Sequence, residues 1–168
     1  GKVSRATRPK YEVWSLGRQT QILIAGAGPT GLVLALWLKK KGIHPRIIDK
    51  SLAPGLSSRA LAVQARTLEF YRQMGIAEQI VARGVTAHEI KLRRLGQVVA
   101  TVPIGALGEH ETPFPYLTFL SQDVHEKLLI HELHELGVDV ERGTELMSFA
   151  QDADGVSVQL KTPQGEES

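Results

Sequence analysis

Three glycines at a fixed spacing carry the clearest chemical signal in this sequence. The segment Gly26-Ala27-Gly28-Pro29-Thr30-Gly31 fits the pattern GxGxxG. Between a strand and a helix, the first glycine of this pattern permits a tight turn, the second lets a pyrophosphate approach the backbone, and the third lets the helix pack closely on the strand. The helix start would then offer free N–H groups and a partial positive charge to the phosphates.

The flanking residues predict the elements that such a motif needs. Residues 22–25 form a short apolar run typical of a buried parallel strand, and residues 32–41 predict a helix that ends in lysines before Gly42. Residues 46–49 predict the next parallel strand, with Asp49 at its carboxyl end. A carboxylate about twenty residues after the glycines suits a ribose 2′-hydroxyl. The order of these elements favours a dinucleotide site over a purely structural glycine turn.

Composition and charge limit the other function classes. The 168 residues contain no cysteine, which excludes disulfides and cysteine nucleophiles and suits a reducing, cytoplasmic location. The net charge of +2 conceals a basic leader, residues 1–20, at +4, so the remainder is at −2 and nucleic-acid binding is disfavoured. Residues 21–38 are uncharged, but a glycine-proline turn interrupts them, which argues against a membrane span.

Two candidate sites depend on position alone. Arg59 follows a turn-rich loop, residues 51–58, which leaves the carboxyl edge of the predicted sheet; it would neutralise a pyrophosphate or else be a solvated loop arginine. His131 and His134 are three residues apart, whereas the metalloprotease zinc motif needs histidines four apart. We therefore expect no metal site there.

The rest of the chain predicts an α/β fold with antiparallel additions. Alternation before and after a Leu-Gly-Gln turn predicts a hairpin, and an Asp-Gly turn predicts another near the end of the chain. The predicted elements are a lead-in at 59–64 to a helix ending at 74, a helix at 76–83, a hairpin within 87–107, a strand at 116–120, a helix at 123–136, a short strand at 138–140, and a terminal hairpin of 144–151 with 156–160.

Five segments of the sequence together resemble one enzyme family. They are GAGPTGL, IIDK, SSRALAVQARTLEFYRQMGI, SQDVHEKLL and LGVDVERGTELMSFAQDADGVSVQL. They are similar to the para-hydroxybenzoate-hydroxylase-like family of FAD-dependent aromatic monooxygenases, over residues 21 to about 160. The VQARTLE segment and the Gln-x-x-x-Glu helix start are more specific than the glycines and distinguish this family from NAD dehydrogenases.

The resemblance implies a Rossmann-like FAD-binding fold, a parallel sheet with helices, over residues 21–168, in which residues 87–120 begin a substrate-covering sheet. It assigns the adenosine ribose to Asp49, the adenosine part to Lys50, the cofactor phosphates to Arg59, and a further cofactor contact to Gln122. The pyrophosphate would lie on the glycine turn, formed by Gly26, Ala27, Gly28, Pro29, Thr30 and Gly31. We assign no residue a catalytic role, and none of the histidines matches a catalytic motif of the family.

The implied reaction uses FAD, with NAD(P)H and O2 as co-substrates. NAD(P)H reduces the flavin, oxygen adds at its C4a carbon, and the resulting hydroperoxide hydroxylates an aromatic or phenolic ring. Family members continue with an Asp-Gly and a later Gly-Asp motif, so we expect Gly1–Ser168 to be the N-terminal portion of an enzyme and inactive alone. A non-catalytic FAD- or ADP-binding module, another FAD oxidoreductase, and homo-oligomer formation stay open as alternatives.

Overall fold

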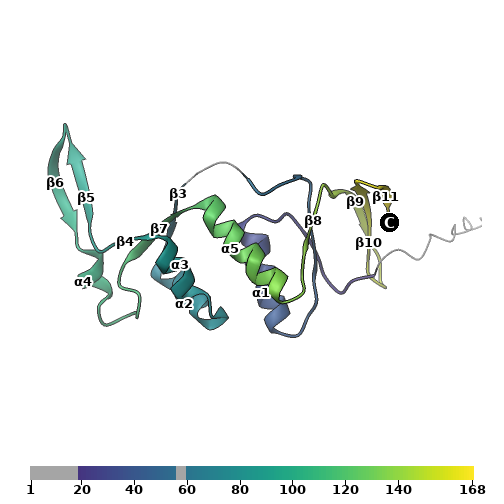
Figure 1. The fold of residues 1–168 in the computed structure, drawn as a ribbon, viewed down its shortest axis with the longest axis horizontal. Helices are drawn as coiled ribbons and strands as arrows, with labels where there is room; N and C mark the ends of the chain where they lie inside the picture. Colours follow the sequence, from purple (N-terminus) through teal and green to yellow (C-terminus); the bar gives the residue numbers. More distant parts are fainter. Residues whose placement is uncertain (1–18, 56–59) are drawn as a thin grey trace, which may run out of the picture.

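A computed structural model describes residues 19–55 and 60–168 of the chain. These residues form a mixed α/β fold in which a helical layer lies between two groups of strands (Figure 1). The β5–β6 hairpin projects at one end, and the β9–β10–β11 sheet lies at the other (Figure 1). The α/β fold with a parallel sheet and antiparallel strands, predicted from the sequence, is confirmed.

The parallel sheet is built around the glycine motif. Its strands are β1 (Leu23–Ala25), β2 (Arg46–Asp49) and β8 (Val140–Arg142), in the order β1-β2-β8. Helix α1 (Pro29–Lys40) connects β1 to β2, and helix α5 (Gln122–Glu135) precedes β8. Both pairings are parallel, so the three strands end at one common edge. This edge is where a ligand of such a sheet binds.

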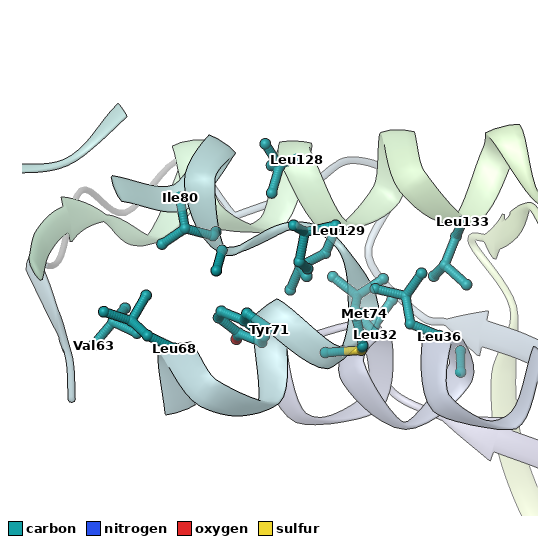
Figure 2. Close-up of a cluster of buried hydrophobic side chains, with 14 of the residues drawn as sticks. Leu32, Leu36, Val63, Leu68, Tyr71, Met74, Ile80, Leu128, Leu129 and Leu133 are labelled. Carbon is teal, nitrogen blue, oxygen red and sulfur yellow. The ribbon is translucent and has the colours of Figure 1, made fainter. Parts of the chain in front are cut away.

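The core lies between the helices. Helix α1 packs against α5, and α2 (Ala65–Met74) and α3 (Ala77–Arg83) pack beside them. Figure 2 shows leucines of α1, α2 and α5 that point toward one another, with Met74 and Tyr71 between them. Leu32, Leu129 and Leu133 are fully buried, so the spacing of apolar residues on α1 and α5 serves this contact.

A second, antiparallel sheet lies on the side of α2 and α3 that faces away from the parallel sheet (Figure 1). Its order is β3-β7-β4, with β7 in the centre. The hairpin β5–β6 and the short helix α4 are inserted between β4 and β7. The bounds are β3 Ala60–Val63, β4 Val85–Ala87, β5 Ile90–Arg94, β6 Gln97–Val102, α4 Ile104–Gly108 and β7 Leu117–Ser121.

The last sheet is a meander of three antiparallel strands. It consists of β9 (Glu145–Gln151), β10 (Val156–Thr162) and β11 (Gly165–Glu167), in the order β11-β10-β9. A backbone hydrogen bond from Asp152 N to the Gly155 carbonyl, 3.0 Å, closes the predicted Asp-Gly turn. The terminal hairpin is therefore confirmed, with β11 as an additional strand.

Several predicted boundaries were wrong. Residues 60–63 are a strand, β3, where we expected only a lead-in to a helix, because β7 supplies hydrogen-bond partners that are distant in sequence. The strand expected at 138–140 begins at Val140, since Val138 N donates to the Leu133 carbonyl at 2.9 Å and completes the end of α5.

Candidate cofactor-binding site

Each glycine of the GxGxxG turn meets a different steric condition. Gly26 has φ +112°, a conformation that favours glycine, and its N–H donates to the Ile48 carbonyl of β2 at 2.8 Å. A Cβ added at Gly31 would lie 2.0 Å from the Gly26 carbonyl oxygen, whereas one added at Gly28 meets no atom within 4 Å. Gly31 therefore allows the helix to pack on the turn, and Gly28 leaves open space above the backbone.

The start of helix α1 is open to an anion. Gly28 is the N-cap, with φ −77° and ψ 179°, and Pro29 occupies the first helical position. No side chain caps the helix, and its first turn contains no acidic residue. The first N–H groups of a helix have no intrahelical partner and carry a partial positive charge. The open space at Gly28 is therefore next to hydrogen-bond donors that suit a phosphate.

Asp49 lies at the carboxyl end of β2, against the glycine turn. Its Oδ2 accepts a 2.7 Å hydrogen bond from the Ala27 N–H, and its Oδ1 accepts a 2.8 Å hydrogen bond from the Ser51 N–H. Partial burial acts to raise the pKa of Asp49, but these two hydrogen bonds and the charge of Arg142 outweigh it and hold the pKa below its usual value. Asp49 is therefore a fixed, ionised acceptor, and its remaining lone pairs suit sugar hydroxyls.

Arg142 is a neighbour of Asp49 that the sequence analysis missed. It ends β8 and is paired in register with Asp49, and its Nη1 lies 3.7 Å from Asp49 Oδ2. The signal that could have found it is its place at the carboxyl end of the third parallel strand. The expected strand at 138–140 stopped short of this residue.

The other predicted site residues differ in how the structure places them. Gln122 is the first residue of α5 and is half-buried; its Nε2 donates to Glu126 Oε1 at 2.7 Å. Helices α1 and α5 pack together and begin on the same side of the helical layer (Figure 1), so the start of α5, where Gln122 lies, is on the side where the glycine turn precedes α1. Lys50 is exposed beside Asp49, and Arg59 lies outside the described residues.

Within residues 19–55 and 60–168, no group of three or more His, Asp or Glu side chains is arranged to hold a metal ion. None of the helices in the described part of the chain is long and apolar enough to cross a membrane.

The sequence is also similar to those of known proteins. A family model described as "FAD binding domain" matches residues 19–168. The chain is 39% identical over 141 residues to 6-methylpretetramide 4-monooxygenase from Streptomyces rimosus, a match that covers 84% of this chain and 25% of that protein. A Rifampicin monooxygenase from Rhodococcus hoagii is 30% identical over 141 residues, with 84% of this chain and 28% of that protein covered.

Solved structures show the same relationship. The p-nitrophenol 4-monooxygenase of Pseudomonas putida DLL-E4 superposes with a TM-score of 0.82 at 25% identity, over 86% of this chain and 37% of that one. Aklavinone-11 hydroxylase, solved with FAD and aklavinone, gives 0.79 at 29% identity, over 89% of this chain and 31% of that one. The chain thus spans between a quarter and two fifths of the length of these relatives. The family match over residues 19–168 confirms the resemblance, and the chain belongs to the FAD binding domain family.

Proposed function

We propose that this chain is the FAD-binding portion of a monooxygenase that hydroxylates an aromatic or phenolic substrate with NAD(P)H and O2. The observation that carries the proposal is the pairing of the open position at Gly28 with the ionised carboxylate of Asp49, at the carboxyl edge of a parallel sheet. Such an edge is where dinucleotides bind. The named relatives are monooxygenases, which supports the reaction class.

The residues fit the ADP half of FAD. The pyrophosphate would lie on the backbone of Gly28, at the N-terminus of α1, within the turn of Gly26, Ala27, Gly28, Pro29, Thr30 and Gly31. The Ala27 N–H already donates to Asp49, so the amides at the helix start are the ones left for phosphate oxygens. Asp49 would accept from the adenosine ribose, and Lys50 and Arg59 would add positive charge near the adenosine and phosphates.

FAD, when bound, would supply the redox chemistry between NAD(P)H and O2. The residues of this chain would bind and orient the cofactor, and we assign none of them a catalytic role. Residues 87–120 would begin the sheet that covers the substrate. The cytoplasmic location expected from the sequence remains a prediction, and homo-oligomer formation stays open.

Steady-state kinetics of the full-length protein with FAD would test the proposed function. We expect phenolic substrates to accelerate NAD(P)H oxidation and to yield a product heavier by one oxygen atom. FAD binding without such acceleration across a panel of aromatic compounds would contradict the monooxygenase assignment and favour a non-catalytic FAD- or ADP-binding module. Substrate oxidation without oxygen insertion would favour another FAD oxidoreductase.

A further inference from the structure

A buried carboxylate accompanies Gln122 on helix α5. Glu126 is only 4% exposed, and the Gln122 side chain donates to it from Nε2, at 2.7 Å to Oε1. The two residues lie one helical turn apart, at the end of α5 that faces the same side as the glycine turn (Figure 1). Burying a carboxylate is costly unless it is hydrogen-bonded, so this contact is a constraint on both side chains.

The chemistry of this contact determines which end of the Gln122 amide is available to a ligand. A glutamine amide has an accepting end and a donating end of nearly equal shape, and in this contact the Gln122 Nε2 donates to Glu126 Oε1. The amide therefore turns its NH2 group toward Glu126 and its carbonyl oxygen away from it. We infer that Glu126 is a positioning residue, which fixes Gln122 so that its carbonyl oxygen is the hydrogen-bond acceptor offered to the cofactor.

A carbonyl oxygen selects a donor on the ligand. Phosphate oxygens only accept, so they would find no partner in it, whereas a hydroxyl group can donate to it. FAD has such hydroxyls on its ribityl chain and on its adenosine ribose. This inference rests on the proposed function and on the cofactor contact that the family resemblance implies for Gln122, with FAD as the ligand.

The decisive variants change the hydrogen-bonding character of the pair and keep its size. Glu126→Gln removes the obligatory acceptor, so the Gln122 amide can flip, and we expect FAD affinity to fall by about three- to tenfold. Gln122→Glu alone would set two carboxylates against each other. The double variant Gln122→Glu with Glu126→Gln restores one donor and one acceptor and leaves a free carboxylate oxygen at position 122. We expect it to recover most of the affinity that either single variant loses.

A similar pair elsewhere on α5 provides the control. Gln79 Nε2 of α3 donates to Glu132 Oε1 at 3.0 Å, and Glu132 lies about three turns after the start of α5. Glu132→Gln changes a comparable side-chain hydrogen bond at a half-buried position, so it should lower the melting temperature no more than Glu126→Gln does and should leave FAD affinity unchanged. A loss of affinity with no matching loss in the Glu132→Gln control separates positioning from general stability.

The measurement is an equilibrium titration of the chain with FAD and, in a parallel arm, with ADP, together with melting temperatures without ligand. A Glu126→Gln effect on FAD alone would assign the contact to the ribityl hydroxyls, and an effect on both ligands to the ribose. Equal FAD affinity of Glu126→Gln and the unmodified chain, or a double variant no better than the single ones, would overturn the inference. Failure of the unmodified chain to bind FAD would instead count against the proposed function.

Discussion

Gly28 and Gly31 belong to one motif but differ in the room they leave for a side chain. A Cβ at Gly28 meets nothing within 4 Å and its φ of −77° suits any residue, so Gly28→Leu should change the free energy of unfolding by less than about 1 kcal/mol. The new side chain would occupy the space of the pyrophosphate, so FAD binding should be lost. Urea unfolding and FAD titration of the same protein would check both parts, and normal FAD binding would refute the placement of the phosphates.

Gly31→Ala tests the opposite case, a glycine of the same motif that has no room for a side chain. Its Cβ would lie 2.0 Å from the Gly26 carbonyl oxygen, which is backbone and has little freedom to move. We expect a loss of about 1 to 3 kcal/mol in the free energy of unfolding, as for other overpacked positions. If urea unfolding shows Gly31→Ala to be as stable as the unmodified chain, α1 does not pack on the turn as described.

His125 makes the stability of the fold depend on pH. The side chain is 3% exposed, and its Nε2 lies 2.8 Å from the Tyr71 hydroxyl. Burial lowers the pKa of His125 below 6.5, so the folded chain keeps it neutral while the unfolded chain takes up a proton. The free energy of unfolding should therefore decrease as the pH falls below 6.5.

His125→Gln isolates this effect, because glutamine cannot titrate and still offers a hydrogen-bond partner to Tyr71. Urea unfolding at a series of pH values should show a shallower decrease below pH 6.5 in the variant. His134 affects the pH dependence of stability in the opposite direction. The hydrogen bond with Asp139 raises the pKa of His134, so the stabilisation from this pair is lost as the pH increases through the pKa that His134 has in the folded chain. Identical slopes in the variant and the unmodified chain would exclude His125 as the source.

At the scale of elements, one arginine joins two sheets. Arg46, the first residue of β2, donates to both carboxylate oxygens of Glu141 on β8, at 2.9 and 2.7 Å. It also donates to both oxygens of Glu167 on β11, at 2.6 and 3.0 Å. These contacts hold the pKa of Arg46 well above its ordinary value, mainly through Glu167 and then Glu141. The guanidinium therefore fixes the last strand against the parallel sheet.

Arg46→Leu should weaken the attachment of β11 to the parallel sheet. We expect the free energy of unfolding to decrease by about 1 to 3 kcal/mol, less than for a fully buried pair because both glutamates are about one-third exposed. Hydrogen exchange should increase in β11, while FAD affinity should stay unchanged, since Arg46 starts β2 and Asp49 ends it. Unaltered exchange in β11 would show that the strand is held by other contacts.

Which elements the sequence could predict follows from how local their signals are. The first strand, α1 and β2 are contiguous, and a glycine turn and an acid mark their ends, so their order was correct. The strand β4, Val85–Ala87, is three residues long and owes its conformation to pairing with β7. Short apolar runs do not distinguish strand from helix, which is why Ala60–Val63 was assigned only as a lead-in.

At the scale of the whole molecule, the candidate site combines residues that are close together in the sequence with residues that are far apart in it. The glycine turn and Asp49 lie within one strand-helix-strand unit, so spacing alone was enough to pair them. Arg142 reaches Asp49 only through the parallel register of β8, so its contact depends on tertiary packing. Glu126 and Gln122 are four residues apart on α5, so the Gln-x-x-x-Glu spacing brings them together locally, whereas the burial of Glu126 depends on packing.

The central claim is that Asp49 and the glycine turn hold the ADP half of FAD, and equilibrium titration of the chain with FAD tests it most directly. We expect saturable binding, which Asp49→Ala weakens by about tenfold or more through loss of a charged acceptor. Asp139→Ala is the matched control: this exposed aspartate pairs with His134 at 2.6 Å, before β8 begins, and should leave the dissociation constant unchanged. An absence of saturable FAD binding, or equal dissociation constants for Asp49→Ala and the unmodified chain, would contradict the account.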